Sequence, residues 1–302
     1  MFQLSNDMDW KSFYDEMIHR AKEYIDIGYW DIKEDELALW LSNFSSDEEK
    51  FLCSLLIYRI IYRNKYPRLS MYNYIINILL PENLKKHNIY TINTLEEFHN
   101  DLKHNPWKLP FKFSTISEID GSASKSGFQI LREFRLRGSF HQKLEVTKQN
   151  IKTLDKDKIK AVILFDDIMG TGEQFDTYIN SVKEEIKDFL FLYCPLVAHK
   201  DGLELIASKN YQNVLILPVE IINEKYSFFH NCFSPKIAEN IDMKELESFY
   251  IDFIKRNTKL RKDLLGKDNQ SLCYVFDMAT PNNTLPIFWY DEENKWNRIF
   301  PR

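Results

Sequence analysis

The sequence predicts an α/β fold in which a parallel sheet is flanked by helices and preceded by a helical domain. Between residues 108 and 302, short apolar runs of strand length alternate with amphipathic segments, the order typical of a parallel sheet. In the first 107 residues, apolar and aromatic side chains recur at helical spacings of three and four. We therefore expect two domains, 1–107 and 108–302, which meet at the proline-rich segment 105–110.

Composition limits the class of function. The 302 residues are 44% apolar and 15% aromatic, enough for one large core or two smaller ones. A formal charge of −5 does not indicate non-specific nucleic-acid binding. The four cysteines are far apart, which is typical of reduced thiols in a cytoplasmic protein. No secretory signal opens the chain and no apolar run is long enough to cross a bilayer, so we expect no membrane association.

Helices are expected throughout the N-terminal domain. One follows Asp9, a second covers 31–41, and a third begins at Ser46, where a hydroxyl cap precedes three acids. The third helix should continue to about residue 64. A further apolar segment, 69–80, should end at Pro81 because proline lacks a backbone N–H. The aromatic stripes of these helices are typical of a core, and they do not indicate what the domain contacts.

A strand is expected over 111–116, followed by a serine-rich loop, 120–127, with one lysine between two glycines. Such a loop can bind a diphosphate through backbone N–H, hydroxyl and ammonium groups, or it can be a plain surface loop. A short strand or helix over 131–137 should follow. Its three arginines either face a polyphosphate or form a solvated edge, and one histidine further on is another candidate: Arg132, Arg135, Arg137 and His141.

The segment 161–175 carries most of the functional information. Five apolar residues, 161–165, predict a strand buried on both faces that stops at Asp166 and Asp167. A turn containing two glycines follows, and then a helix over 173–189. Such a turn directs backbone N–H groups and the positive end of the helix at an anion, whereas the two acids suit sugar hydroxyls. The pattern therefore predicts a site for a sugar phosphate.

The residues exclude two nucleotide-binding motifs at this turn. No Lys-Ser/Thr pair follows the glycines, as a Walker loop requires, and the third glycine of a dinucleotide fingerprint is missing. An ordinary strand-to-helix turn, with Thr171 capping the helix, would give the same pattern.

Two further strands, 189–198 and 214–219, should complete the sheet. Between them, His199, Lys200 and Asp201 are expected at the same sheet edge as the acid pair. Lys200 either contacts a diphosphate or belongs to a polar turn. A helix over 241–256 and a strand that ends at Phe276 follow.

The run from Val162 to Gly172 resembles the phosphoribosyl-diphosphate (PRPP) motif of type I phosphoribosyltransferases, in which a hydrophobic strand precedes two acids, two apolar residues and a Thr/Gly loop. The resemblance implies a type I phosphoribosyltransferase-like sheet in which Asp166 and Asp167 contact ribose. The loop that would hold the 5′-phosphate comprises Gly170, Thr171, Gly172, Glu173 and Gln174. Because Gly170 and Gln174 replace hydroxyl residues of many family members, the phosphate should depend more on backbone amides.

The same resemblance implies roles for the serine-rich loop and for a metal ion. Diphosphate would be bound by Ser124, Lys125, Ser126 and Gly127. Mg²⁺ would bridge the diphosphate and the ribose hydroxyls near Asp166 and Asp167, through substrate or water. Asp166, Asp167 and Lys125 are then the expected catalytic residues, and positioning with charge neutralisation would carry the rate.

The C-terminal segment sharpens the family assignment. Gly266-Lys-Asp-Asn-Gln, a strand, and Thr280-Pro-Asn-Asn-Thr-Leu-Pro-Ile-Phe-Trp289 are similar to the phosphoribosyltransferase-like domain of bacterial conflict (anti-phage) systems, as is Asp166-Asp-Ile-Met-Gly-Thr-Gly-Glu-Gln174. The similarity extends from about residue 8 to residue 302. It implies an effector (toxin) of a defence system such as a retron, beside a reverse transcriptase with its DNA or RNA. Pro281 to Thr284 either reads a base or forms a structural turn.

The resemblance leaves three outcomes for the ligand. PRPP or a related ribose-phosphate could be transferred to an acceptor, PRPP or a nucleotide could be hydrolysed, or the protein could bind its ligand as a non-catalytic sensor. The residues do not identify the acceptor or the oligomeric state.

Overall fold

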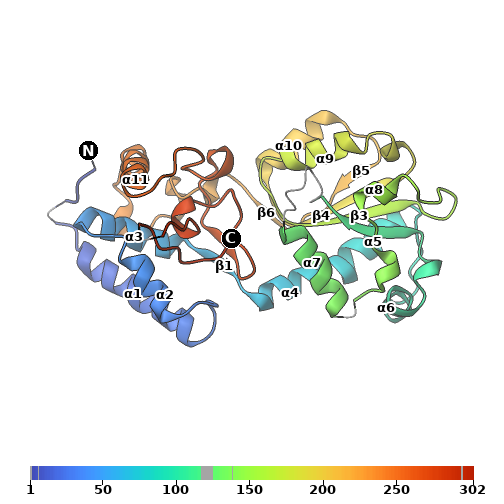
Figure 1. The fold of residues 1–302 in the computed structure, drawn as a ribbon, viewed down its shortest axis with the longest axis horizontal. Coiled ribbons are helices and arrows are strands. Elements are labelled where there is room, and N and C mark those ends of the chain that lie inside the picture. Colours follow the sequence, from blue (N-terminus) through green and yellow to red (C-terminus); the bar gives the residue numbers. More distant parts are fainter. Residues whose placement is uncertain (1, 6, 117–124, 138, 294) are drawn as a thin grey trace. The chain divides into compact units, whose positions relative to one another are not determined.

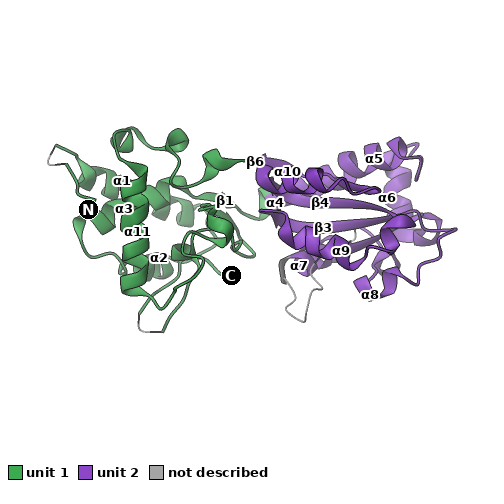
Figure 2. Ribbon diagram, turned by 90° about the horizontal axis from the view of Figure 1, so that it is seen from above, with its two compact units in different colours: residues 1–67, 223–302 green, residues 68–222 purple. Residues whose placement is uncertain are grey.

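The computed structural model describes residues 2–5, 7–116, 125–137, 139–293 and 295–302, and it divides into two compact units (Figures 1 and 2). Unit 1 joins residues 1–67 with residues 223–302, and unit 2 comprises residues 68–222. This division differs from the boundary predicted at residue 107. The helices just before the sheet belong with the sheet, and the end of the chain packs with its beginning.

Unit 2 is built on a parallel sheet, which confirms the predicted fold class. Four strands lie in the order β2 (Phe111–Thr115), β3 (Ala161–Met169), β4 (Leu190–His199) and β5 (Val214–Ile216), and β6 (Glu220–Ile222) pairs with the end of β4. All pairs are parallel; for example, Phe111 pairs with Ala161, and Leu164 pairs with Tyr193. The carboxyl ends of β2, β3 and β4 therefore meet at one edge of the sheet.

Helices cover both faces of this sheet (Figure 1). On one face, α8 (Lys148–Ile151), α9 (Glu173–Ser181) and α10 (Lys200–Lys209) bury apolar side chains against alternate residues of β3 and β4. On the other face lie α4 (Lys65–Tyr74), α5 (Leu80–Lys86), α6 (Leu95–His104) and α7 (Lys125–Leu136). Phe134 of α7 packs against both the sheet and a neighbouring helix. Its ring centroid lies 4.8 Å from that of Phe165 in β3 and 4.4 Å from that of Tyr72 in α4.

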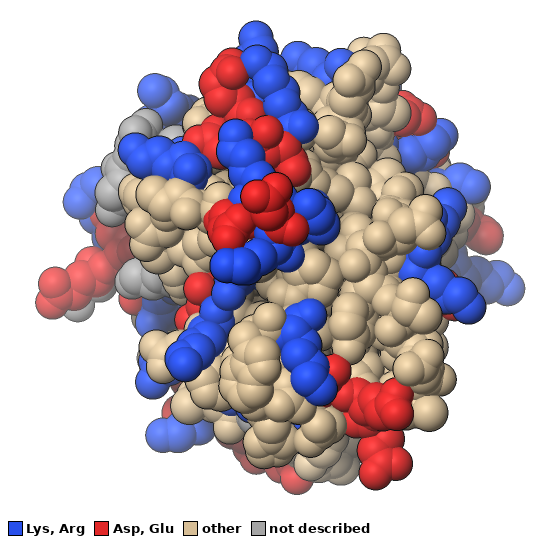
Figure 3. Space-filling model, turned by 90° about the vertical axis from the view of Figure 1, so that its right-hand side faces the viewer, with Lys and Arg blue, Asp and Glu red and all other residues tan. Residues whose placement is uncertain are grey.

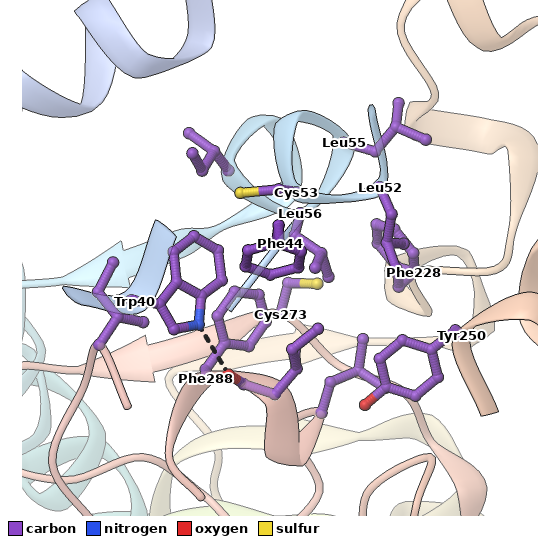
Figure 4. Close-up of a cluster of buried hydrophobic side chains, with 14 of the residues drawn as sticks. Trp40, Phe44, Leu52, Cys53, Leu55, Leu56, Phe228, Tyr250, Cys273 and Phe288 are labelled. Carbon is purple, nitrogen blue, oxygen red and sulfur yellow. Dashed lines mark hydrogen bonds between the residues drawn. The ribbon is translucent and has the colours of Figure 1, made fainter. Parts of the chain in front are cut away.

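Unit 1 combines helices from both ends of the chain. It contains α1 (Trp10–Asp26), α2 (Glu34–Leu41), α3 (Asp47–Arg59) and α11 (Met243–Asn257), and β1 (Ile61–Arg63) pairs in parallel with β7 (Tyr274–Phe276). Its core is aromatic, as Figure 4 shows around Trp40, Phe44 and Phe288. The indole nitrogen of Trp40 donates a 2.9 Å hydrogen bond to the Ile287 carbonyl oxygen, which ties the N-terminal helices to the C-terminal segment.

Several predicted boundaries need correction. The helix that Ser46 caps ends at Arg59 instead of near residue 64, because the chain turns into β1 to pair with a strand more than two hundred residues later. Pro81 does not end the preceding helix. It lies in the first turn of α5, where a missing N–H is tolerated, after a π-helical turn over Ile75–Leu79. The helix expected over 173–189 is regular only to Ser181.

The described helices include none that is both long and apolar enough to span a membrane. On the face shown in Figure 3, basic and acidic side chains are interspersed, and no area of one sign spans it. That face therefore offers no broad basic surface for nucleic acid.

Candidate functional site

The two acids lie inside β3, not after it. The strand continues to Met169 because β4 is equally long, so that Asp166 pairs with Pro195 and Ile168 pairs with Val197. Both acids are largely buried, with Asp166 exposed by 2% and Asp167 by 7%. The sequence predicted a strand that stops at residue 165 and releases both carboxylates toward a ligand. The structure instead holds them in the extended backbone near the carboxyl end of the sheet.

Asp166 is held by β4 and lies on the side of the sheet that α9 covers. Strand alternation places it on the same face as Leu164, and the Tyr193 hydroxyl donates a 2.7 Å hydrogen bond to its Oδ2. The Phe175 ring of α9 stacks on Tyr193, with 4.1 Å between centroids and 6° between planes. Burial raises the pKa of the Asp166 carboxyl well above its usual range, and the neighbouring charge of Asp167 raises it further.

Asp167 is coupled to Asp166 through the backbone as well as through charge. Its N–H donates a 3.0 Å hydrogen bond to Oδ1 of Asp166, and its own Oδ1 accepts a 2.9 Å bond from the N–H of Ile168. Two carboxyl groups this close and this well shielded from water cannot both be ionised cheaply. The pair therefore needs either a shared proton or a nearby cation.

The turn after β3 places a glycine at the start of α9. Gly172 is the N-cap residue of the helix, with φ of +82°, and it has no side chain with which to cap the first N–H groups. The N-cap position that the sequence assigned to Thr171 is thus held by Gly172. Glu173 and Gln174, the first two residues of the helix, are exposed at the positive end of the helix dipole, where an anion is favoured.

A second glycine, Gly202 in α10, supports this turn from behind. A Cβ atom on Gly172 would lie 2.9 Å from the Gly202 carbonyl oxygen, and one on Gly202 would lie 2.5 Å from the Gly170 carbonyl oxygen. The glycines of the turn are thus required by packing against α10 as well as by backbone conformation. His199 ends β4, and Lys200 and Asp201 begin α10 directly after it, so the expected turn is absent, but the three residues lie at the same sheet edge as the acid pair, as predicted.

The residues predicted to bind diphosphate follow β2 in the sequence. Ser124 is outside the described residues, and so is most of the loop before it. Lys125, Ser126 and Gly127 form the first turn of α7 instead of a loop, and the side chains of Lys125 and Ser126 are not described.

Other candidate residues have partners of their own. Arg135 pairs with Glu145 at 3.2 Å, Arg137 pairs with Glu133 at 3.4 Å, and Lys200 pairs with Glu204 at 3.3 Å. Nδ1 of His141 accepts a hydrogen bond from the N–H of Lys143.

The C-terminal motif lies in unit 1, where it is part of the core. The Thr284 hydroxyl is fully buried and donates a hydrogen bond to the Tyr274 carbonyl oxygen at 2.5 Å. Gly266 packs against the Asn283 carbonyl oxygen, which a Cβ atom would approach to 2.4 Å. The segment thus serves as a structural turn.

Sequence reasoning missed Tyr193 and Gly202. A tyrosine within a buried apolar strand does indicate a hydroxyl in need of a partner, but the partner depends on the register between β3 and β4. Gly202 carried no signal, because its role depends on which turn packs against α10.

A family model, PRTase-CE, matches residues 37–302, so the chain belongs to the PRTase-CE family. The match begins within α2 and includes both the acid-pair strand and the C-terminal motif. The resemblance inferred from the sequence is thereby confirmed, although the match begins later than the predicted residue 8.

Among solved structures, the chain is similar to a Helicobacter pylori xanthine-guanine-hypoxanthine phosphoribosyltransferase at 12% identity. The similarity covers 62% of this chain and 96% of that one, with a TM-score of 0.30, which is too low to establish a common fold. A search of curated proteins found no match.

We predict that Gly172→Ala destabilises unit 2 more than Gly28→Ala destabilises unit 1. Both glycines have positive φ, which costs alanine about 1–2 kcal/mol, but only the Cβ at 172 also meets a backbone atom, since nothing lies within 4 Å at Gly28. Urea unfolding, followed for the transition of the unit that holds each residue, measures the difference. Equal losses would show that α10 does not constrain the turn.

We also predict that Asp166→Asn stabilises the ligand-free protein at pH 8. Because the pKa of Asp166 is raised on folding, the folded protein retains a proton that the unfolded chain has lost, so wild-type stability falls as pH rises above the ordinary value of 3.8. An uncharged amide avoids this loss, which is about 1.4 kcal/mol for each unit of the raise.

Thermal unfolding across pH 4–8 tests this, with the exposed Asp157→Asn as the control. The advantage of Asp166→Asn should shrink as pH falls. A variant less stable than wild type at pH 8 would mean that the buried carboxylate is ionised and stabilised by its neighbours.

Proposed function

We propose that this protein binds PRPP or a related ribose-phosphate at the carboxyl edge of the unit 2 sheet. The observation that carries the proposal is the sequence of groups along β3 and α9, where a buried acid pair precedes a glycine turn and the amino end of a helix. Acceptors for sugar hydroxyls and donors for a phosphate are thus a few residues apart. Membership of the PRTase-CE family supports the same ligand class.

The 5′-phosphate would lie against residues 170–174. Backbone N–H groups would contribute most of its hydrogen bonds, because the turn carries glycine at two of these positions and helix α9 begins directly after them. Glu173 is exposed, and its side chain would have to point away from the phosphate. Close packing of Gly172 on Gly202 would keep the turn in the conformation that presents its amides.

The acid pair fits a divalent cation on electrostatic grounds. Burial and the charge of Asp167 raise the pKa of Asp166. A cation beside the two carboxyl groups would lower this pKa again by its attraction for negative charge, and both groups could then ionise. The described residues include no group of three metal-ligating side chains, so Mg²⁺ would take its remaining ligands from substrate phosphates and water. When bound, Mg²⁺ would neutralise the charge on a leaving diphosphate.

Ribose-phosphate transfer from PRPP is the reaction that the family and site together favour, with the acid pair orienting the ribose and the start of α7, including Lys125, facing the diphosphate. One observation favours binding without transfer: Asp166 is already engaged by Tyr193 at 2.7 Å and almost fully buried. A sensor needs only that the ligand be held. Release of diphosphate from PRPP, with nucleobases or with water as acceptor, separates transfer and hydrolysis from a sensor that releases none.

The biological role that we propose is that of a cytoplasmic effector in an anti-phage system such as a retron, beside a reverse transcriptase and its DNA or RNA. Support comes from the resemblance of the acid-pair and C-terminal motifs to conflict-system domains. If the role is correct, growth arrest on induction must require the acid pair; arrest that persists in the Asp166→Asn/Asp167→Asn double variant would exclude it.

Binding of PRPP tests the site directly. We expect Asp166→Asn and Asp167→Asn each to weaken binding at least about tenfold in excess Mg²⁺, because each removes a charge-assisted partner of the ribose or of its cation. Isothermal titration measures the affinity, and Asp188→Asn, which precedes the amino end of β4, is the matched control. Affinity unchanged in both acid variants would refute the assignment of the acid pair to the ribose.

A further inference from the structure

A cavity lies beside β2, the edge strand of the sheet in unit 2. It has a volume of about 790 Å³, is open to solvent on one side, and is lined by the edge strand β2, by α7, and by the segment 142–154 that includes α8. This volume is within the range of small-molecule sites. Neither Asp166, Asp167 nor any residue of α9 lines it, so the cavity shares none of the residues proposed to hold the ribose and the 5′-phosphate.

The cavity has an excess of positive charge. Among the described residues, Lys112, Arg132 and Arg135 line it, together with one acid, Glu145. Glu145 is matched by Arg135 at 3.2 Å, and the Lys112 ammonium donates to a neutral acceptor, the Lys143 carbonyl oxygen, at 2.7 Å. Arg132 is exposed and makes no hydrogen bond or ion pair with any residue that the structure describes. An anion would therefore find two cations here, Lys112 and Arg132, that no carboxylate of the described part of the chain neutralises.

An aromatic ring lies one helical turn from this free arginine. Phe128 is 39% exposed, and it is four residues before Arg132 on α7, which places the two side chains on the same face of the helix. Across the cavity, Thr147 and Asn150 contribute a hydroxyl and an amide. A stacking surface, unneutralised cations and an amide are the features that bind a base and a phosphate.

We propose that this cavity binds a nucleoside monophosphate, with the base on Phe128, the phosphate at Arg132 and Lys112, and polar base atoms at Asn150. The site would lie next to the ribose-phosphate site without sharing its residues. Thr115 at the end of β2 lines the cavity and pairs with Phe165, the residue directly before Asp166. The nucleotide would thus be bound at the strand adjacent to the acid pair, whether it acts there as an acceptor or as an effector.

Titration of the full chain with the common ribonucleoside 5′-monophosphates tests the proposal, with the corresponding nucleosides and inorganic phosphate as separate probes. We expect Arg132→Ala and Phe128→Ala each to weaken nucleotide binding about tenfold, since a charge-assisted contact or a stacked base is lost. Leu136→Ala, at the end of the same helix, and Arg137→Ala, directly after it, lie outside the cavity and are the matched controls. Affinity should also fall with added salt.

The outcome is separable from that of the ribose-phosphate proposal. Asp166→Asn should bind nucleotide like wild type, and Phe128→Ala should bind PRPP like wild type. The proposal is overturned if no nucleotide binds at millimolar concentration, or if Arg132→Ala matches Arg137→Ala. It is equally overturned if inorganic phosphate binds as tightly as the nucleotides and Phe128→Ala has no effect, because the cavity would then be a simple anion site.

Discussion

The hydrogen bond from the Tyr193 hydroxyl to Asp166, beneath the ring of Phe175, connects three elements on which the candidate site depends. It fixes the acid to β4 and brings the first turn of α9 against the sheet. An uncharged side chain at 166 would fold more easily, because a buried carboxyl next to a second one costs free energy. The binding of a cation or a sugar hydroxyl at the carboxyl groups would offset this free-energy cost. That offset is the physical basis of the proposed function.

The turn after β3 is constrained from two sides. Its backbone conformation requires glycine at 172, and the close approach of α10 requires glycine at 202. A phosphate at this turn would therefore be bound by backbone N–H groups that close packing holds in place, and not by flexible side chains. Such preorganisation lowers the entropic cost of holding a phosphate. It also explains how the site could function with Gly170 and Gln174 where many phosphoribosyltransferases have hydroxyl residues.

Local sequence patterns predicted the positions of many helices and strands, but they did not predict which distant segments pair with one another. The apolar runs located β3 and β4, and Ser46 marked the start of α3 as its N-cap. By contrast, the local pattern predicted that Ile61 to Arg63 would be helical. The segment is a strand because it pairs with Tyr274 to Phe276 at the other end of the chain, a partner that no local pattern indicates. The same limit applies to the site: the turn and both acids could be read from sequence, whereas Tyr193 required the register of β3 on β4.

The central claim is that the acid pair accepts a cation together with a phosphorylated sugar. Titration of the wild-type protein with Mg²⁺-saturated PRPP, in two buffers of different ionisation enthalpy at each of several pH values above the ordinary carboxyl pKa of 3.8, measures the protons exchanged on binding. The account predicts net proton release, because Asp166 gives up its proton beside the incoming cation. Binding that releases no proton, or no binding at all, would contradict it.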